Sequence, residues 1–239
     1  MSGFFLCWLR HTVEVMGESL NFNHEQQYWQ QGIGNLAGID EAGMGALAGP
    51  VMAAAVIFEA SFATNYNLQP ITSNLPSIRD SKKLSAKQRE IAEVWIKEHA
   101  LAWGVGEASV ADITELNIRN ASHLAMRRAI AGLTLVPELI LVDGTPAQVH
   151  PDIPAVNIIN GDALVFSIAA ASILAKVARD ATMARLHEEY PHYQWESNKG
   201  YGSRLHLVAL DSYGASPHHR PTYAPVAAVL GQQPVGLTK

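Results

Sequence analysis

Two apolar segments of this chain each end in acidic residues. The first is Leu36–Glu41 (LAGIDE), which ends in Asp40 and Glu41. The second is Glu138–Val142 (ELILV), which is followed directly by Asp143. Continuous apolar runs of this kind are typical of buried strands, and a buried acid is rare unless it is paired or binds a metal. The two segments therefore predict a buried sheet with acidic groups at the ends of its strands.

The remaining segments predict an α/β domain around this sheet. Ser85 is placed to cap a helix, and Gly132 is placed to end one. Further strands are expected over Val51–Glu59, Leu101–Ser109 and Val156–Ile159, and helices over residues 85–99, 111–132, 163–189, 204–213 and 226–230. Phe62–Arg79 contains two prolines and is expected to be a loop. Three strands followed by helix–strand alternation are typical of an α/β fold with a mixed sheet.

The chain is expected to comprise one domain and two extensions. Residues 1–33 are polar without sustained periodicity, so we expect an N-terminal extension that is poorly ordered. Residues 34–214 hold the strands, the longer helices and the acids, and residues 215–239 form a C-terminal extension. The 239 residues carry 48% hydrophobic and 16% charged side chains, which is ordinary for a globular protein.

Composition also limits the location and the partners. No apolar run approaches the roughly eighteen residues of a membrane-spanning helix, so we expect no membrane partner. Cys7 is the only cysteine, which excludes an internal disulfide and fits a cytoplasmic protein. The net charge of −5 argues weakly against a nucleic-acid partner, because a local basic patch can bind phosphate within an acidic protein.

A fourth acid, Asp162, follows the strand Val156–Ile159 and begins a helix. Ligand sites of α/β sheets lie at the carboxyl ends of strands, so at least three of the four acids are expected to converge. Carboxylates without cysteine or closely spaced histidine ligands suit Mg²⁺ or Mn²⁺, and a pair of such ions can promote phosphoryl displacement. Two simpler interpretations stay open: Asp162 as a helix cap and Asp143-Gly144 as a turn.

The adjacency of Asp40 and Glu41 conflicts with a shared site, because neighbouring side chains of a strand point to opposite faces. We expect the strand to break there, at the glycines of the following turn. That turn, Gly43–Gly45, allows two interpretations on its own. Its backbone N–H groups could bind phosphate, or its glycines could only permit a tight bend.

Six motifs in chain order resemble those of ribonuclease HII of the bacterial type. They are GIDEAGMGALAGPVMAAAVI, RDSKKLS, LVDG, NGDALVFSIAAASILAKVARD, NKGYGS and HHRPTYAPV. The resemblance implies a ribonuclease H-like fold, with a five-stranded mixed sheet flanked by helices and a small C-terminal helical extension. It also implies an endoribonuclease that cuts the RNA strand of RNA–DNA hybrids and the 5′ side of single ribonucleotides in duplex DNA. Two Mn²⁺ or Mg²⁺ ions would serve the reaction, which leaves a 3′-hydroxyl and a 5′-phosphate.

The same resemblance assigns roles to individual residues. The catalytic and metal-binding residues would be Asp40, Glu41, Asp143 and Asp162, the four acids singled out above. The loop Gly43, Met44 and Gly45 would contact the ribonucleotide 2′-OH through its backbone, and Tyr201 would pack at the next sugar and sense the RNA-to-DNA junction. Phosphate contacts would come from Lys82, Lys83, Lys176 and Arg179. The implied partners are RNA–DNA hybrid and ribonucleotide-containing duplex DNA, and we expect a monomer.

Three positions depart from the family pattern, in which the loop reads Gly-Arg-Gly. Met44 stands in place of that arginine, Ala46 in place of a proline, and Asn160 in place of a lysine. The first and third changes each remove a positive charge near the site, so we expect weaker substrate affinity with the chemistry retained. His218-His219-Arg220 is interpreted as a surface or phosphate-facing cluster.

Two alternative functions remain. One is a nuclease of the same fold with another substrate, such as a resolvase or ribonuclease HIII, although the latter would carry a long N-terminal domain. The other is a weakly active or inactive hybrid-binding protein.

Overall fold

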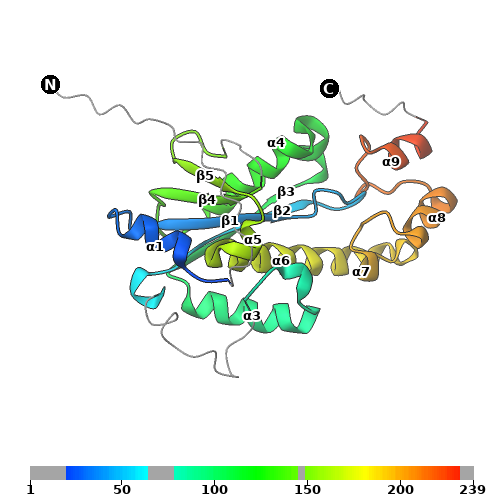
Figure 1. Ribbon diagram of the computed structural model, residues 1–239. Helices are drawn as coiled ribbons and strands as arrows, with labels where there is room; N and C mark the ends of the chain where they lie inside the picture. Colours follow the sequence, from blue (N-terminus) through cyan, green and yellow to red (C-terminus); the bar gives the residue numbers. More distant parts are fainter. Residues whose placement is uncertain (1–19, 64–77, 145–148, 232–239) are drawn as a thin grey trace.

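The computed structural model describes residues 20–63, 78–144 and 149–231, and most of Phe62–Arg79 lies outside these ranges. Five strands form one mixed sheet with helices on both faces (Figure 1), as expected. The strands are β1 (Leu36–Ala42), β2 (Val51–Ile57), β3 (Ala102–Ala108), β4 (Leu139–Asp143) and β5 (Ala155–Ile158). The helices are α1 (Asn23–Trp29), α3 (Ala86–His99), α4 (Val110–Ala131), α5 (Gly161–Leu164), α6 (Phe166–Glu189), α7 (Trp195–Asn198), α8 (Arg204–Tyr213) and α9 (Ala224–Val229), with 3₁₀ turns η1 (Ser81–Lys83) and η2 (Pro191–Tyr193).

The strand order β3-β2-β1-β4-β5 places β1 and β4 side by side at the centre. β1 is antiparallel to β2, whereas β1, β4 and β5 are mutually parallel along the sheet. In the parallel register Ile39 lies opposite Val142. The residues that follow these two, Asp40 and Asp143, therefore lie at the same edge of the sheet.

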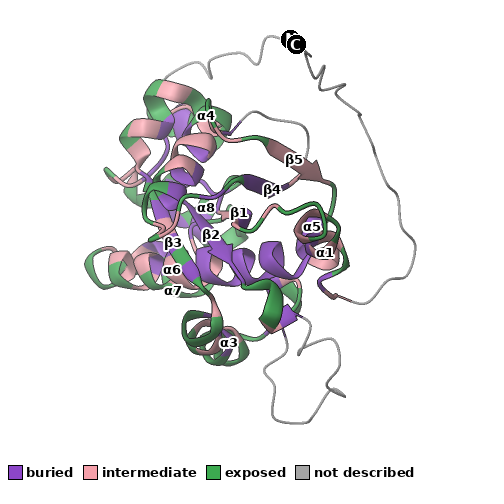
Figure 2. Cartoon of the chain, turned by 90° about the vertical axis from the view of Figure 1, so that its left-hand side faces the viewer, coloured by how far each residue is buried: buried purple, intermediate pink, exposed green. Residues whose placement is uncertain are grey.

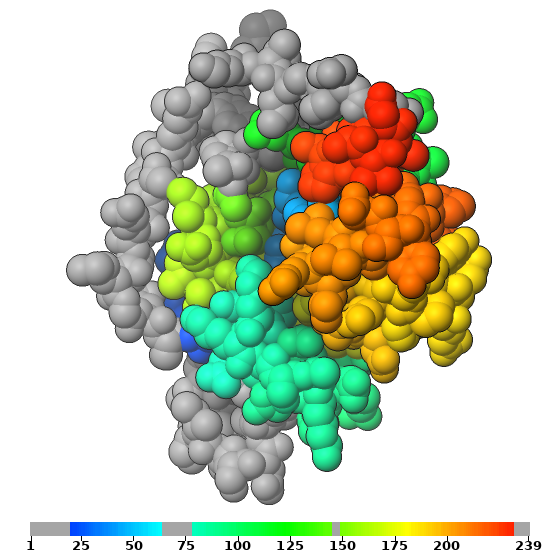
Figure 3. Space-filling view, turned by 90° about the vertical axis from the view of Figure 1, so that its right-hand side faces the viewer, coloured from blue at the N-terminus to red at the C-terminus, as the bar shows by residue number. Residues whose placement is uncertain are grey.

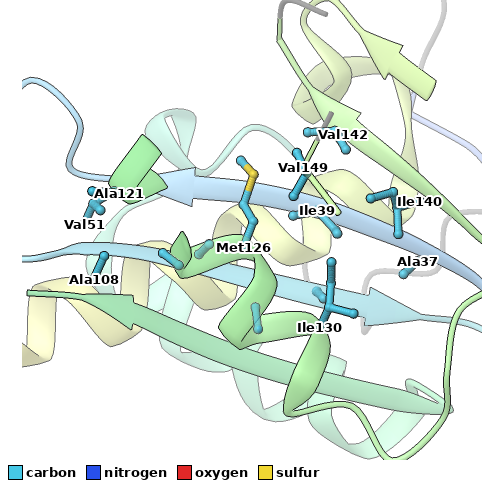
Figure 4. Close-up of a cluster of buried hydrophobic side chains, with 14 of the residues drawn as sticks. Ala37, Ile39, Val51, Ala108, Ala121, Met126, Ile130, Ile140, Val142 and Val149 are labelled. Atoms are coloured by element: carbon cyan, nitrogen blue, oxygen red, sulfur yellow. The ribbon is translucent and has the colours of Figure 1, made fainter. Parts of the chain in front are cut away.

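One face of the sheet is covered by α4. The cluster between them includes Ile39, Ile140 and Val142 from the strands and Met126 and Ile130 from the helix (Figure 4). β3 carries Gly104 and Gly106, where an added Cβ would overlap the backbone of α4. The two glycines thus allow the helix to lie directly on the strand.

The other face is covered by α6, with α3 packed against the outer side of that helix (Figure 1). The alanine-rich first half of α6 is buried almost without interruption (Figure 2). A Cβ at Gly38 would overlap the backbone of Ser167, so the glycine on β1 and the small residues on α6 together permit this close approach.

The expectation of a poorly ordered N-terminal extension is wrong for residues 20–33. These residues form α1, and Phe22 is fully buried against Phe58 and Phe166. The ring centroids of Phe22 and Phe166 are 4.3 Å apart. Composition suggested an appendage because polar residues predominate, whereas the aromatic side chains of Phe22, Tyr28 and Trp29 anchor the segment in the core.

Helix α4 is not continuous, contrary to the sequence expectation. Asn117 has φ +66° and ψ 165°, which is not helical. Its side chain accepts hydrogen bonds from the N–H groups of Arg119 and Asn120, at 3.1 and 3.2 Å. Asn117 therefore caps a second helical segment, which begins beside the acidic edge of the sheet.

The predicted final helices are present, with α7 to α9 grouped beyond the end of β1 (Figure 1). Leu47 of the β1–β2 turn, Leu210 of α8 and Val226 of α9 form one buried cluster. None of the helices within the described ranges combines the length and apolar character that a membrane-spanning segment requires.

Candidate active site

Three aspartates converge at the carboxyl ends of the central strands. Asp40 lies near the carboxyl end of β1, Asp143 is the last residue of β4, and Asp162 lies in α5. One carboxylate oxygen from each falls within 4.8 Å of the others. Asp143 Oδ1 also accepts a hydrogen bond from the Gly161 N–H at 2.6 Å, which links β4 to the start of α5. Parallel pairing of β1 and β4 is the reason that distant segments of the sequence meet here.

Glu41 does not join this group, and the expectation that the strand breaks between Asp40 and Glu41 is wrong. β1 continues to Ala42, with Glu41 paired opposite Ala53. Glu41 lies instead in a cavity of about 350 Å³ on the α4 face, together with Ser122 and Asp143. Regular alternation along β1 thus sends the two neighbouring carboxylates to different faces, and Asp143 borders both.

Burial and mutual repulsion oppose ionisation of Asp40, Glu41 and Asp143. Burial, followed by the charges of Glu41 and Asp143, raises the pKa of Asp40 well above its usual range. Burial, followed by the charge of Asp143, raises the pKa of Glu41 to about 7. The pKa of Asp143 is also raised, first by burial and then by Asp162. A divalent cation would relieve this repulsion, so the clustered oxygen donors fit a Mg²⁺ or Mn²⁺ site.

Sequence reasoning missed the residue that orients Asp40. Ser172 of α6 is buried and its side chain hydrogen-bonds the Asp40 carboxylate. Its oxygen lies 2.9 Å from the hydroxyl of Ser81 in η1. When Asp40 is ionised it can only accept from Ser172, and the Ser81 hydroxyl then donates to Ser172. A buried serine within an alanine-rich helix was the available signal.

The two lysines of η1 directly follow Ser81 in the sequence. The Lys82 ammonium is 3.5 Å from Asp162 Oδ2, and its side chain is mostly exposed. Lys83 is also exposed and lies 3.8 Å from Asp80. Lys176 of α6 is mostly buried and pairs with Asp180 at 2.6 Å. All three lysines thus have an anionic partner, but the Lys82 and Lys83 side chains are far more exposed to an incoming phosphate than that of Lys176.

Arg179 does not face solvent, so the expected phosphate contact is corrected. Its side chain is fully buried. The guanidinium donates to the carbonyls of Ala48, Pro50 and Lys199, at 3.2, 3.1 and 2.8 Å. Arg179 instead connects the β1–β2 turn to the segment that carries Tyr201.

Arg220 also hydrogen-bonds the β1–β2 turn, and sequence reasoning missed this role as well. It is fully buried and donates to the carbonyls of Gly43, Met44, Gly49 and Pro50. His219 is buried as well, so the interpretation of residues 218–220 as a surface cluster is wrong for these two residues. Gly43 has φ +98°, and a Cβ there would overlap Arg179. The glycine is therefore required both by its backbone conformation and by close packing.

Figure 3 shows a hollow at this end of the molecule, where the blue residues at the end of β1 are visible between the orange C-terminal segment and the yellow-green segment near α5. The remaining predicted residues are at least partly exposed. Met44 is 37% exposed and Tyr201 is 40% exposed. The Tyr201 ring centroid lies 5.3 Å from the Arg179 guanidinium carbon. Asn160 is exposed with φ +56°, a conformation that asparagine adopts more readily than lysine.

Solved structures with the same architecture define the class of protein. The ribonuclease H2 from Pyrococcus horikoshii OT3 matches 82% of this chain and 96% of its own, with a TM-score of 0.67 and 21% identity. Bst-RNase HIII in complex with Mn²⁺ matches 82% of this chain and 69% of its own, with a TM-score of 0.64 and 15% identity. The fold is therefore ribonuclease H-like, with an acidic site at the carboxyl ends of the central strands.

Sequence comparison then identifies the family. The model of the ribonuclease HII family matches residues 37–226. Ribonuclease HII of Paracidovorax citrulli is 52% identical over 198 residues, which is 82% of this chain and 77% of the relative. Ribonuclease HII of Neisseria meningitidis serogroup C is 47% identical over 197 residues, or 82% and 96% of the two chains. The chain belongs to the ribonuclease HII family, and it is an endoribonuclease of the ribonuclease H type that depends on a divalent metal.

Proposed function

We propose that this protein cuts the RNA strand of RNA–DNA hybrids and the 5′ side of single ribonucleotides in duplex DNA. The products would carry a 3′-hydroxyl and a 5′-phosphate. The observation that carries the proposal is the convergence of Asp40, Asp143 and Asp162, whose carboxylate oxygens lie within 4.8 Å of one another. Family membership supports the choice of a phosphodiester in a ribonucleotide-containing strand as the substrate.

Asp40, Asp143 and Asp162 would hold divalent ions, with Glu41 reaching the same region from the α4 face. Two Mn²⁺ or Mg²⁺ ions, when bound, supply an activated water and stabilise the leaving oxygen. The protein's own groups fix the carboxylates for this purpose. The Ser172 hydroxyl orients Asp40, the Gly161 N–H orients Asp143, and the Lys82 ammonium lies beside Asp162.

Substrate recognition would use the glycine turn and Tyr201. The buried Arg220 guanidinium donates hydrogen bonds to the carbonyls of Gly43 and Met44. The N–H groups of the turn would then donate to the substrate. A contact to the 2′-OH is the general means by which a protein distinguishes RNA from DNA. Tyr201 would pack at the sugar beyond the ribonucleotide, and Lys82, Lys83 and Lys176 would contact phosphates.

The cellular role that follows is removal of ribonucleotides from DNA and clearance of RNA primers. A monomer acting in the cytoplasm suffices for this role, because all four acids come from one chain.

The test is cleavage of three duplexes by the purified protein with Mn²⁺ or Mg²⁺. One carries a single ribonucleotide in DNA, one pairs an all-RNA strand with DNA, and one is all DNA. We expect cleavage of the first two, with the cut 5′ of the ribonucleotide in the first, and none of the third. Tight binding of the hybrid without turnover in either metal would favour the alternative of an inactive hybrid-binding protein.

A further inference from the structure

A buried polar network contacts the backbone of Tyr201. It consists of Trp195 from α7, His206 from α8 and His219 from the C-terminal segment, all three buried. The Nε2 atoms of His206 and His219 are 3.0 Å apart. Two imidazoles in such contact require defined proton positions, and none of these residues belongs to the acidic site.

The hydrogen-bond partners determine which ring nitrogen of each histidine carries the proton. The Ser216 N–H donates to His219 Nδ1 at 2.9 Å, so that nitrogen is an acceptor and the proton of His219 lies on Nε2. His206 Nδ1 lies 2.8 Å from the Tyr201 carbonyl, which can only accept. His206 is therefore protonated on Nδ1, and its Nε2 accepts from His219 and from Trp195 Nε1 at 3.1 Å.

The network excludes the charged form of either histidine. A proton on His206 Nε2 would face the N–H groups of Trp195 and His219. Consistent with this arrangement, burial lowers the pKa of His206, and burial followed by the charge of His206 lowers the pKa of His219 to about 4. The hydrogen-bond geometry therefore favours the neutral form of both imidazoles, each in a single tautomer.

The end point of the network is the backbone of Tyr201. Its carbonyl accepts from His206 and also from the Ser203 N–H at 2.8 Å, and its own N–H donates to the Asn198 carbonyl at 2.9 Å. The side chain, by contrast, is 40% exposed beside the Arg179 guanidinium. The peptide group is held from the interior while the ring is partly exposed to solvent.

We propose that His206 is a positioning residue that sets the Tyr201 ring against the substrate, and that Trp195 and His219 hold His206 in the tautomer this requires. The C-terminal segment would thereby contribute to ribonucleotide selection without touching the substrate. The inference rests on the proposed function, in which Tyr201 packs at the sugar beyond the ribonucleotide.

Two substitutions at His206 distinguish the contribution of Nδ1 from that of Nε2. In His206→Asn the amide nitrogen takes the place of Nδ1 and can still donate to the Tyr201 carbonyl. In His206→Gln the amide takes the place of Nε2, so the bonds to Trp195 and His219 can form but the bond to Tyr201 is lost. His206→Asn removes the two buried hydrogen bonds at Nε2, whereas His206→Gln removes only the one to Tyr201. A defect that appears only in His206→Gln therefore does not come from the larger loss of buried hydrogen bonds.

The first measurement is kcat/KM with Mn²⁺ on the single-ribonucleotide duplex and on the all-RNA hybrid. One lost neutral hydrogen bond corresponds to about a tenfold change. We expect His206→Gln to lose about tenfold on the single ribonucleotide and less than about threefold on the hybrid, whereas His206→Asn stays within about threefold on both. Equal losses by both variants on both substrates would mean that His206 only stabilises the fold.

A double variant tests whether His206 acts through Tyr201. If it does, adding His206→Gln to Tyr201→Ala causes no further loss on the single ribonucleotide, because the ring to be positioned is absent. Losses that multiply would overturn the proposal.

A readout without catalysis separates this proposal from the proposed function. Hydrogen–deuterium exchange of the backbone amides in residues 199–203 should accelerate in His206→Gln and stay at the wild-type rate in His206→Asn. If Tyr201→Ala leaves the substrate preference unchanged, the junction role of Tyr201 fails while the exchange result still decides the positioning role. Wild-type exchange in His206→Gln would overturn the latter.

If His206→Gln does not fold, His219 offers a second pair. His219→Gln keeps a donor near the place of Nε2, and His219→Leu removes it. Faster exchange at residues 199–203 in His219→Leu alone is then the expected result, and identical exchange in both variants would contradict the proposal.

Discussion

Glu25 accepts hydrogen bonds from both the backbone N–H and the hydroxyl of Ser167, at 2.9 and 2.8 Å. The two residues are 142 positions apart in the sequence. Ser167 lies in the first turn of α6, where the helix N–H groups lack internal partners. A carboxylate from α1 thus caps the helix that supports Asp40, and the N-terminal segment contributes to the stability of the active-site scaffold.

This contact predicts a pH-dependent stability. Burial raises the pKa of Glu25 to about 7 against the lowering effect of the Ser167 bonds. Because the pKa of Glu25 is higher in the folded than in the unfolded protein, folding favours the protonated side chain. The contribution of Glu25 to the free energy of unfolding is therefore fully present below about pH 4.5 and is lost as pH rises through about 7. The loss is on the order of 3 kcal/mol. Glu25→Gln should remove it, which urea unfolding of both proteins between pH 5 and pH 8 with a chelator will measure. Parallel pH curves for the two proteins would contradict the assignment.

Asp143→Asn should abolish most of the activity while preserving the fold. The asparagine oxygen can still accept from the Gly161 N–H, but a ligand charge is lost. We expect turnover with Mn²⁺ to fall by at least about 10–100-fold. The metal-free variant should be more stable than the wild type, because burial and repulsion from Asp162 disfavour the Asp143 carboxylate. Turnover and thermal unfolding in chelator are the two measurements, and Asp152→Asn, at an exposed acid, is the control. Near-wild-type turnover would remove Asp143 from the site.

Tyr201→Ala should reduce cleavage of a single ribonucleotide more than it reduces duplex binding. The ring is partly exposed beside Arg179, and in the proposed function it contacts a sugar, whereas most of the binding free energy comes from phosphate contacts. Cleavage rates and binding in Ca²⁺ provide the comparison, with Tyr213→Ala on the exposed side of α8 as the control. Losses of the same size in cleavage and binding would show that Tyr201 is structural.

Met44→Arg should tighten duplex binding by about tenfold, since a charge-assisted bond at a half-exposed position contributes about 1.5 kcal/mol. The log–log salt dependence should steepen by about one unit, as expected for one additional neutralised phosphate. The rate at saturating substrate should change little, because the acids are untouched. Binding across a salt series in Ca²⁺ tests this, with Met44→Leu as the neutral control. An unchanged slope would mean that residue 44 faces away from the phosphates.

The sequence by itself determined the order of strands and helices and the position of Asp40, Asp143 and Asp162 at strand ends. These features depend on local periodicity and on residues that start or stop an element, and both are visible within a short window. The tight packing of α6 also followed locally, because its alanines and serines leave room for the sheet.

Only the tertiary structure decided which polar groups find each other in the interior. The sequence predicted that Asp40 and Glu41 belong to one site, but β1 continues past both residues and their side chains lie on opposite faces of the sheet. It presents Arg179 as a cation for phosphate, but the guanidinium is enclosed by backbone carbonyls. The physical reason is that a buried polar side chain must bond to whichever partner is brought within reach. That partner is set by the docking of elements far apart in the chain, as Glu25 with Ser167 and Arg220 with Gly43 demonstrate.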